Sequence, residues 1–342
     1  MTQIIVLFGG VSDERHVSVA SAQNVLRALD GKALAWFQSA DGAVYDVAVS
    51  EVLAHQQPFI TDFIPSRPAI FPDIEQALDT LPVDDPVFFL ALHGTGGEDG
   101  TLQHLLEARG LPFTGSASVA SAAAFDKERA KELVRGKVRV AESRVARNAN
   151  EIRNVATDML ERHERIVLKP LAGGSSRGLF FLGRDGDIDS IAQQISSPYI
   201  VEQFIRGREL TVGVLDDGDQ AVALPVIEIE VDSDRAFDYE GKYLGAGTRE
   251  ICPAVIPDEL AREAQETAVA AHLALGCEGY SRTDLIASDD GVYYLETNTL
   301  PGLTTSSLVP QELAVVGISF ADFLRRQLDL AVERRNTVPV PS

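Results

Sequence analysis

Short apolar runs alternate with segments of helical spacing along the first part of the chain. Continuous apolar runs at 3–10 and 86–94 each end in glycine, a pattern typical of buried parallel strands. Each run is followed by a polar turn and a segment with the spacing of a helix, at 16–30 and at 101–110. This order of strand, glycine turn and helix predicts an α/β unit, in which the less regular residues 40–82 are interpreted as an insertion.

The rest of the chain predicts a larger group of strands and three further helical segments. Residues 118–134 have a helical composition. Strands are predicted at 165–170, 199–204, 209–215, 221–231 and 291–299. Residues 258–276 show the clearest helical pattern, ending at Gly276, and residues 318–335 predict an amphipathic closing helix.

Composition excludes several classes of protein. The chain has 342 residues, 45% hydrophobic and 24% charged, as in a globular protein of two or three compact units. Its net charge of −21 argues against a nucleic-acid partner and an anionic membrane surface. No apolar run reaches the roughly 20 residues that span a bilayer, and the start of the chain lacks the basic segment of a signal peptide. Cys252 and Cys277 lack metal-ligand spacing and are interpreted as reduced thiols of a cytoplasmic protein.

A candidate phosphate loop follows the strand at 165–170. Lys169 ends this strand, and Gly173 and Gly174 let the following backbone approach a ligand closely. Backbone N–H groups and serine hydroxyls of such a loop can bind phosphate oxygens, although the spacing is not that of a Walker A loop. A polar hairpin turn is the alternative interpretation.

A candidate magnesium site lies near the end of the last strand pair. Arg282 and Asp284 are two residues apart on one predicted strand, and Glu296 and Asn298 are two apart on the next. If these strands form a hairpin across residues 288–291, three oxygen ligands converge beside one arginine, as suits Mg²⁺ at nucleotide phosphates. The alternative interpretation is that these residues are the solvent-exposed polar positions of two strands in which buried and exposed residues alternate.

Two glutamates flank a turn between predicted strands. Glu202 ends one strand and Glu209 begins the next, with Arg-Gly-Arg between them. A carboxylate at the mouth of a nucleotide pocket commonly holds ribose hydroxyls. Taken alone, a β-turn with solvated charges is the simpler interpretation.

Eight motifs, in this order, resemble the D-alanine–D-alanine ligases of the ATP-grasp superfamily from residue 4 to about 330. They are GGVSDERHVSVASA, ALHGTGGEDGTLQ, FDKERAK, VLKPLAGGSSRG, EQFIRGRELTV, DYEGKYL, RTDL and LETNTLPGLTTSSLVP. The resemblance implies an α/β (α+β) fold, the three-domain ATP-grasp fold with a Rossmann-like N-terminal domain. The expected domains are an N-terminal substrate domain at 1–117, a central ATP-grasp domain at 118–202 and a C-terminal catalytic domain at 203–342.

The resemblance also implies a reaction and its nucleotide contacts. ATP would phosphorylate the carboxylate of one D-alanine, and the amine of a second would attack the acyl phosphate. The residues expected to bind ATP are Lys127 and Lys169 at the phosphates, Glu202, Phe204 and Ile205 around the adenine, Glu209 at the ribose, and Lys242. Two Mg²⁺ ions, for which Mn²⁺ can substitute, would be held by Asp284, Glu296 and Asn298.

Further residues are assigned by the same resemblance to the reacting groups. Arg282 would stabilise the transferred phosphoryl group and the oxyanion, with the Gly302 N–H as a second donor. Ser307 and Leu308 would receive the second substrate's carboxylate, and His93 would face the first substrate. Glu98 and Asp99 are expected to cap the helix that follows them. Ser175 and Tyr243 would close over the site with Lys242 in a mobile loop, and Tyr243 favours an amide over an ester product.

One position departs from the family pattern. The pattern reads Glu-Val-Ser, where the glutamate pairs with the ammonium group of the first D-alanine, but this chain has His16 there. A neutral histidine brings no charge, and a protonated one would repel an ammonium group. Glu14 can substitute only if it faces the site, whereas its place in a helix or turn predicts that it faces elsewhere. The remaining alternatives are a non-standard first substrate and a weakened ligase.

The function expected from these features is an ATP-dependent carboxylate–amine ligase that makes a dipeptide for peptidoglycan synthesis. One alternative is a ligase with a different first substrate. An alternative from another functional class is a protein that binds a nucleotide without catalysing a reaction. The expected partners are small amino-acid substrates, without nucleic acid or membrane. Family members also suggest a cytoplasmic homodimer.

Overall fold

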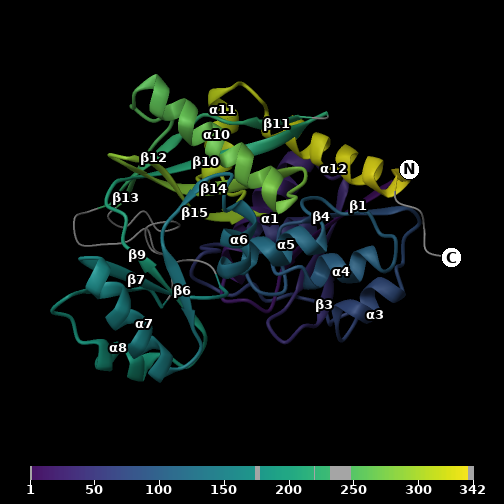
Figure 1. The fold of residues 1–342 in the computed structure, drawn as a ribbon. Coiled ribbons are helices and arrows are strands. Elements are labelled where there is room, and N and C mark those ends of the chain that lie inside the picture. The colour runs from purple at the N-terminus through teal and green to yellow at the C-terminus, as the bar shows by residue number, and fades with distance from the viewer. Residues whose placement is uncertain (1, 174–177, 219, 232–247, 338–342) are drawn as a thin grey trace.

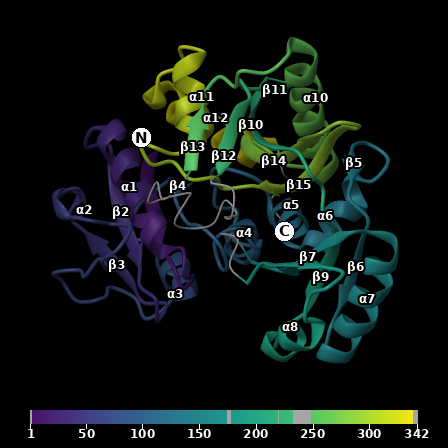
Figure 2. The same ribbon diagram turned by 90° about the vertical axis from the view of Figure 1, so that its left-hand side faces the viewer.

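Three β-sheets organise the residues that the computed structural model describes, which are 2–173, 178–218, 220–231 and 248–337. Figure 1 and Figure 2 show three groups of elements, around β1 and α1, around β7 and α7, and around β10 and α10. Within the described residues, no helix combines the length and apolar character that crossing a bilayer requires.

The N-terminal sheet is built on the apolar run that begins the chain. β1 (Gln3–Gly9) lies between β2 (Ala33–Gln38) and β4 (Pro86–Leu90) and is parallel to both, as the continuous apolar pattern predicts. β3 (Val44–Val47) pairs antiparallel with β2 at the edge, so the segment interpreted as an insertion contributes a strand to this sheet. The helices of this region are α1 (Arg15–Leu29), α2 (Val49–Ala54), α3 (Ile74–Asp79) and α4 (Thr101–Glu107).

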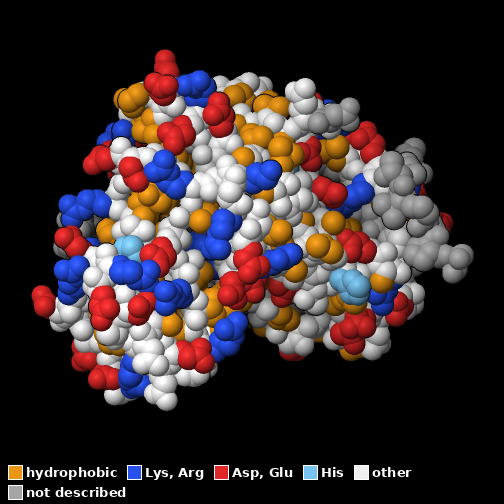
Figure 3. All heavy atoms as spheres, in the orientation of Figure 1, with side chains coloured by type: hydrophobic (Ala, Val, Ile, Leu, Met, Phe, Trp, Pro, Cys, Tyr) orange, Lys and Arg blue, Asp and Glu red, His pale blue; other side chains and the backbone are white. Residues whose placement is uncertain are grey.

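The central sheet is antiparallel and is covered by helices on one face. Its strands, in the order β6-β9-β7-β8, are β6 (Ser143–Ala146), β9 (Tyr199–Gln203), β7 (Arg165–Pro170) and β8 (Phe180–Gly183). α7 (Ala149–Arg162) and α8 (Ile188–Gln194) pack on the face that carries Ile166, Leu168 and Val201. Alternation along the strands therefore leaves Lys169 and Glu202 on the opposite face. Acidic and basic side chains intermingle on the outside of this lobe (Figure 3), where Arg153 pairs with Asp189 at 2.5 Å.

The C-terminal sheet has seven strands in the described part of the chain, with the order β13-β12-β10-β14-β15-β5 and β11 paired to β10. They are β5 (Arg139–Val140), β10 (Arg208–Asp217), β11 (Gln220–Ala223), β12 (Ile227–Val231), β13 (Thr248–Ile251), β14 (Tyr280–Ser288) and β15 (Gly291–Asn298). α10 (Asp258–Leu275) packs its predicted apolar side against β10 and β14, and Gly276 ends it with φ 70°, as the sequence predicts.

The hydrophobic cores do not follow the expected domain boundaries at two places. α5 (Ser118–Phe125) and α6 (Lys127–Val134), expected in the central domain, pack with Leu275 of α10 and Tyr294 of β15. α12 (Phe320–Thr337), the last helix, places Phe323 and Leu324 in the core around β1, together with apolar residues of the segment that leads to α11 (Leu308–Val315). The N-terminal and C-terminal regions are thereby joined by shared packing.

Candidate active site

One face of the C-terminal sheet collects the predicted phosphate and metal side chains. The hairpin predicted across residues 288–291 is confirmed, because β14 and β15 pair with Asp284 opposite Glu296 and Arg282 opposite Asn298. On the other side of β14, Thr211 of β10 lies opposite Asp284. On β14, Leu285 and Ala287 face α10, so Arg282 and Asp284 project from the opposite face. A β-bulge at Asp284 and Leu285 shifts the register of β15 and brings Glu296 and Asn298 to that same face.

Asp284 organises this face. Arg282 donates to it through two parallel bonds of 2.8 Å, from Nε to Oδ1 and from Nη2 to Oδ2. Thr211 donates a further bond of 2.6 Å to Oδ1, and the Asn298 amide lies 3.4 Å from Oδ2. Arg282 and Asp284 are both buried, at 7% and 3% exposure respectively. The bidentate contact fixes the plane of the guanidinium group before any ligand arrives.

Two lysines approach this face from other elements. Lys127, at the start of α6, has its Nζ 3.7 Å from Glu296 Oε2 and donates to the Gly173 carbonyl at 2.8 Å. Lys169 reaches in from the end of β7. Burial lowers its pKa, but the charge of Glu202 outweighs that effect with help from Glu296 and Glu209, so the pKa of Lys169 is raised. The predicted phosphate-binding lysines therefore share one electrostatic environment with the acids of the C-terminal sheet.

The donor atoms suit Mg²⁺ bound together with a nucleotide. No group of three or more His, Cys, Asp or Glu side chains with metal-binding geometry occurs among the described residues. Asp284 and Glu296 are nevertheless direct cross-strand neighbours, and Asn298 lies beside Asp284. Mg²⁺ typically takes one or two carboxylates and completes its shell with phosphate oxygens and water. The residues present fit such a site.

A buried carboxylate lies between two lysines on the inner face of the central sheet. Glu202, only 2% exposed, contacts Lys169 Nζ at 2.7 Å through Oε2 and Lys131 Nζ at 2.5 Å through Oε1. Burial raises the pKa of Glu202, but the two ammonium groups more than compensate and lower it to about 2. The carboxylate predicted to contact the adenine is therefore ionised and held from both sides.

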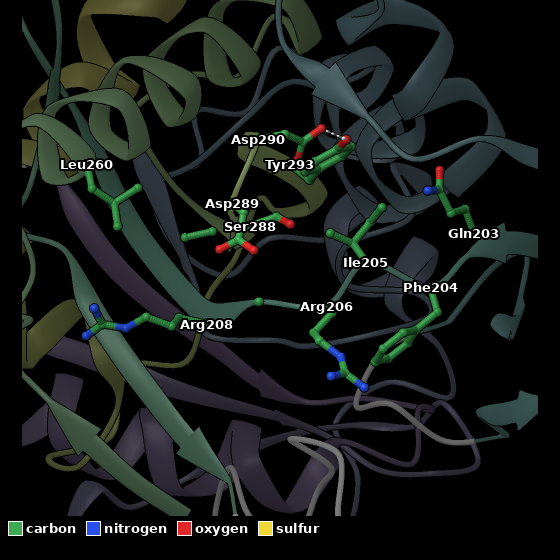
Figure 4. Close-up of a pocket in the computed structure, with 12 residues that line it drawn as sticks. Gln203, Phe204, Ile205, Arg206, Arg208, Leu260, Ser288, Asp289, Asp290 and Tyr293 are labelled. Carbon is green, nitrogen blue, oxygen red and sulfur yellow. Dashed lines mark hydrogen bonds between the residues drawn. The ribbon is translucent and has the colours of Figure 1, made fainter. Parts of the chain in front are cut away.

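The segment that links β9 to β10 lines a cavity of about 570 Å³. The cavity's other walls come from Leu260 and from the β14–β15 turn, where the Tyr293 hydroxyl donates to Asp290 at 2.8 Å. Figure 4 shows Ile205 pointing toward Tyr293, whereas Phe204 points away on the other side of the segment. The Phe204 ring lies 4.6 Å from the Arg165 guanidinium. Phe204 and Ile205, two of the three residues expected to frame the adenine, thus project in opposite directions.

The structure corrects the expectation for the first motif. Glu14, expected to face elsewhere, is 9% exposed and turned toward the loop after β4, where a Cβ at Gly94 would lie 2.6 Å from its Oε2. His16 instead points outward and pairs with Asp62 at 2.8 Å. The expectation failed because Glu14 precedes α1 in a turn, where helical spacing does not set the direction of a side chain. Glu14, and not His16, brings a carboxylate to the loop after β4.

Glu98 turns toward Gly94 and Leu300, contrary to its expected capping role. Its Oε2 accepts from the Gly94 N–H at 2.8 Å and its Oε1 from the Leu300 N–H at 3.2 Å, whereas Asp99 accepts from the Thr101 N–H at the start of α4 as expected. Burial and then the charge of Glu14 raise the pKa of Glu98 to about 8, although both N–H groups and Arg282 oppose them. Glu14 and Glu98 thus lie close enough together for the charge of Glu14 to raise the pKa of Glu98.

Replacing Glu98 with glutamine is expected to make the protein more stable than the wild type at pH 8 but less stable at pH 5, because the amide nitrogen cannot replace a carboxyl oxygen that accepts from a backbone N–H. The raised pKa keeps Glu98 protonated in the folded state while the unfolded chain ionises near its ordinary value of 4.5, so stability falls as pH rises from there to about 8. The variant should gain roughly 2–5 °C in Tm at pH 8 over the wild type, measured by thermal unfolding. An exposed control, Glu266→Gln, should show no such pH-dependent gain, and an equal response of both variants would contradict the assignment.

His93 links the N-terminal region to the loop after β15. It is buried, and burial lowers its pKa to about 4, so the ring is neutral. Because the Leu300 carbonyl can only accept, Nδ1 carries the proton and donates to it at 2.9 Å, while Nε2 accepts from the Ser21 hydroxyl at 3.0 Å. The same hydroxyl accepts from the Leu303 N–H at 3.2 Å. Gly302, the predicted oxyanion donor, lies within this braced segment.

The predicted carboxylate-binding residues lie at the start of α11. The Ser307 hydroxyl accepts from the Thr304 N–H at 3.0 Å and lies 2.7 Å from the Thr304 hydroxyl. Leu308 is the first residue of α11 and packs with Ile227 and Ile229. The positive end of the α11 dipole therefore lies at the predicted site of the second carboxylate.

Three predicted site residues, Ser175, Lys242 and Tyr243, lie outside the residues that the structure describes, so the closing loop stays a prediction. The structure adds Lys131 and Glu312, which the sequence analysis did not single out, and Glu98, which the sequence analysis assigned only to a helix cap. Lys131 could have been found from its i, i+4 spacing to Lys127. Glu312 is the one acid of α11, is fully buried and accepts from the Gly213 N–H at 2.7 Å. Burial raises its pKa well above the usual range. Apart from its place in the ALHGTGGEDG motif, nothing in the sequence indicated that Glu98 would turn toward Gly94 and Leu300.

Two family profiles match most of the chain. The profile described as "D-ala D-ala ligase N-terminus" matches residues 3–116, and the one described as "D-ala D-ala ligase C-terminus" matches residues 141–329. Among individual proteins, the D-alanine–D-alanine ligase of Syntrophobacter fumaroxidans is 38% identical over 339 residues, covering 96% of this chain and 97% of the relative. That of Rhodospirillum rubrum is also 38% identical, covering 94% of this chain and 95% of the relative.

Solved structures share the arrangement. The VanG D-Ala:D-Ser ligase from Enterococcus faecalis aligns with a TM-score of 0.80 at 30% identity, covering 96% of this chain and 99% of that one. The D-alanine–D-alanine ligase from Bacillus anthracis complexed with ATP aligns with a TM-score of 0.73 at 26% identity, covering 98% and 99%. The described fold is therefore that of these ligases, including one that holds ATP.

Proposed function

The chain belongs to the D-alanine–D-alanine ligase family, and on that premise we propose that it joins two D-alanine molecules while ATP becomes ADP and phosphate. The observation that carries the proposal is the one-sided cluster of Arg282, Asp284, Glu296 and Asn298, approached by Lys127 and Lys169. A site for binding nucleotide alone does not need a buried arginine fixed in a bidentate contact at the phosphate end. The cluster thus favours catalysis over the nucleotide-binding alternative.

The first step activates the carboxylate of one D-alanine. A carboxylate oxygen forms a bond to the γ-phosphorus of ATP, the bond from that phosphorus to the bridging oxygen breaks, and ADP leaves. The fixed Arg282 guanidinium faces the negative charge of the transferring group. Asp284, Glu296 and Asn298 would hold Mg²⁺, which would supply charge neutralisation at the phosphate oxygens.

The second step forms the amide bond. The neutral amine of the second D-alanine bonds to the acyl carbon, and the carbonyl oxygen takes up negative charge. The nitrogen then gives up one proton to solvent or to the departing phosphate, and the carbon–oxygen bond to phosphate breaks. Arg282 and the Gly302 N–H are the proposed stabilising donors for this oxyanion. Ser307 and the N-terminus of α11 receive the carboxylate of the attacking molecule, which orients its amine.

Glu14 is the proposed partner of the first substrate's ammonium group. No carboxylate was expected here from the sequence, because His16 replaces the family's glutamate. Glu14 lies against Gly94 and close to Glu98 and can supply that carboxylate, whereas His16 pairs with Asp62. The reason for a non-standard first substrate therefore disappears. D-Serine as the second substrate is an alternative to be tested, because the Enterococcus faecalis relative is a D-Ala:D-Ser ligase. We further propose that the chain acts in peptidoglycan precursor synthesis, in the cytoplasm and as a homodimer; membership of the family supports this proposal.

Phosphate release from ATP is expected to require both Mg²⁺ and D-alanine and to produce D-alanyl-D-alanine. The direct test incubates the purified chain with ATP and D-alanine, or with D-alanine plus D-serine, and identifies the products by mass spectrometry alongside a phosphate assay. Chelating the divalent ions with EDTA should stop the release, and Mg²⁺ or Mn²⁺ should restore it. A chain that binds ATP but releases no phosphate with either amino acid would contradict the proposal.

A further inference from the structure

Helix α6 presents two lysines, four residues apart, to two different sheets. Lys127 reaches Glu296 of the C-terminal sheet at 3.7 Å, whereas Lys131 reaches Glu202 of the central sheet at 2.5 Å. The spacing places both on one side of the helix. Lys131 is only 2% exposed, so its ammonium group is matched by the buried carboxylate and not by water. The helix therefore ties together the two sheets that enclose the proposed nucleotide site.

The single carboxylate of Glu202 contacts two lysines, one more than is needed to balance its negative charge. One of its oxygens contacts Lys131 and the other contacts Lys169, so the three groups together carry one net positive charge. Lys169 is the more accessible lysine, at 16% side-chain exposure against 2% for Lys131. It also lies at the end of its strand, directly before the predicted phosphate loop. Of the two lysines, Lys169 is thus the one able to move to a ligand.

A move by Lys169 requires that Glu202 keep a partner. An ionised carboxylate left alone in a buried site is strongly unfavourable, so a single lysine paired with Glu202 would be held there. With Lys131 in place, Lys169 can turn from Glu202 toward phosphate oxygens without leaving the carboxylate uncompensated. Lys131 itself is too deep to be a ligand of the nucleotide.

We propose that Lys131 is a positioning residue that holds Glu202 in place and so releases Lys169 to bind the nucleotide's phosphates. The inference rests on the proposed function only in taking the ligand to be an adenine nucleotide. It predicts a specific defect: loss of Lys131 weakens the contribution of the phosphates to binding and leaves the chemical step intact once nucleotide is saturating.

The test measures ADP and adenosine binding to the full chain in the presence of Mg²⁺ by calorimetry, for the wild type and three variants. Lys131→Met should lower the ratio of adenosine Kd to ADP Kd by about tenfold or more, and Lys131→Arg should recover most of it. Arg129→Met removes a charge from the solvent side of the same helix, where Arg129 is 57% exposed, and should leave the ratio unchanged. In turnover, Lys131→Met should raise KM for ATP with kcat within about threefold of the wild type.

A double variant keeps the inference testable if Lys131→Met alone does not fold. Lys131→Met combined with Glu202→Gln removes both buried charges, so Lys169 has no carboxylate to abandon and the ratio should return toward the wild-type value. An unchanged ratio in a folded Lys131→Met protein, or a double variant no better than the single one, would overturn the inference. Failure of the proposed ligase activity would show separately, as wild-type ADP binding without phosphate release from ATP.

Discussion

Replacing Arg282 with lysine is expected to slow phosphate release by about a thousandfold at saturating ATP and D-alanine. Lysine keeps the positive charge but cannot make the two parallel bonds that Arg282 makes to Asp284, so its ammonium group is not fixed toward the reacting centre. The Arg282 guanidinium is the proposed stabilising group for both the transferring phosphoryl group and the later oxyanion. Both steps should therefore slow, while ADP affinity changes little.

Arg249→Lys provides the matched control for this substitution. Arg249 lies on β13 of the same sheet, is 74% exposed and pairs with Glu230 at 3.3 Å, so the exchange should leave turnover within about twofold of the wild type. Thermal unfolding of both variants separates loss of catalysis from loss of structure. If folded Arg282→Lys retains more than a tenth of the wild-type rate, Arg282 is not the group that stabilises the transferred charge.

Glu14→Gln is expected to raise KM for the first D-alanine by about a hundredfold, since a hydrogen bond to a charged group contributes roughly 1.5–3 kcal/mol. Glutamine preserves the shape of the side chain beside Gly94 but offers no charge to an ammonium group. Steady-state kinetics at saturating ATP, with D-alanine varied, measures the effect. ATP binding in the absence of D-alanine should be unchanged, because Glu14 lies in the N-terminal region, away from the lysines at the nucleotide.

His16→Ala distinguishes the two candidates from the first motif. His16 contacts Asp62 near the surface, so its removal should change KM for D-alanine by less than about threefold. A large effect of His16→Ala together with a small effect of Glu14→Gln would reverse the roles of the two residues and restore the case for an unusual first substrate.

Features that depend on alternation and pairing were predictable from the sequence. Two-residue spacing places Arg282 and Asp284 on one face of β14 and Glu296 and Asn298 on one face of β15. A tight turn alone would set Asp284 opposite Leu295, and it is the β-bulge between Asp284 and Leu285 that shifts the register and brings Glu296 opposite Asp284. The long helix α10 was equally clear, since its apolar residues repeat at helical spacing up to Gly276. Local periodicity determines which side chains share a face within each strand or helix, whereas the bulge that aligns the two strands has no periodic signal.

Features that depend on irregular backbone or on distant packing were not predictable. The direction of Glu14 is set by a turn that has no period, and the inward rotation of Glu98 depends on N–H groups of Gly94 and of Leu300, which is 202 residues away from Glu98 along the chain. Likewise, the partner of Lys131 is chosen by how α6 packs between two sheets. No window along the chain contains that information, because each contact joins segments whose distance in space is set by the whole fold.

The helix that ends the chain has a consequence for how the protein is made. α12 supplies Phe323, Leu324 and Leu328 to the core around the first strand, and Arg334 donates to the Phe113 carbonyl at 2.6 Å. A chain growing on the ribosome therefore exposes an apolar surface on its oldest part until its youngest part has emerged. Translation that stops before residue 320 would yield a polypeptide with an unfinished first core, a ready substrate for chaperones and proteases.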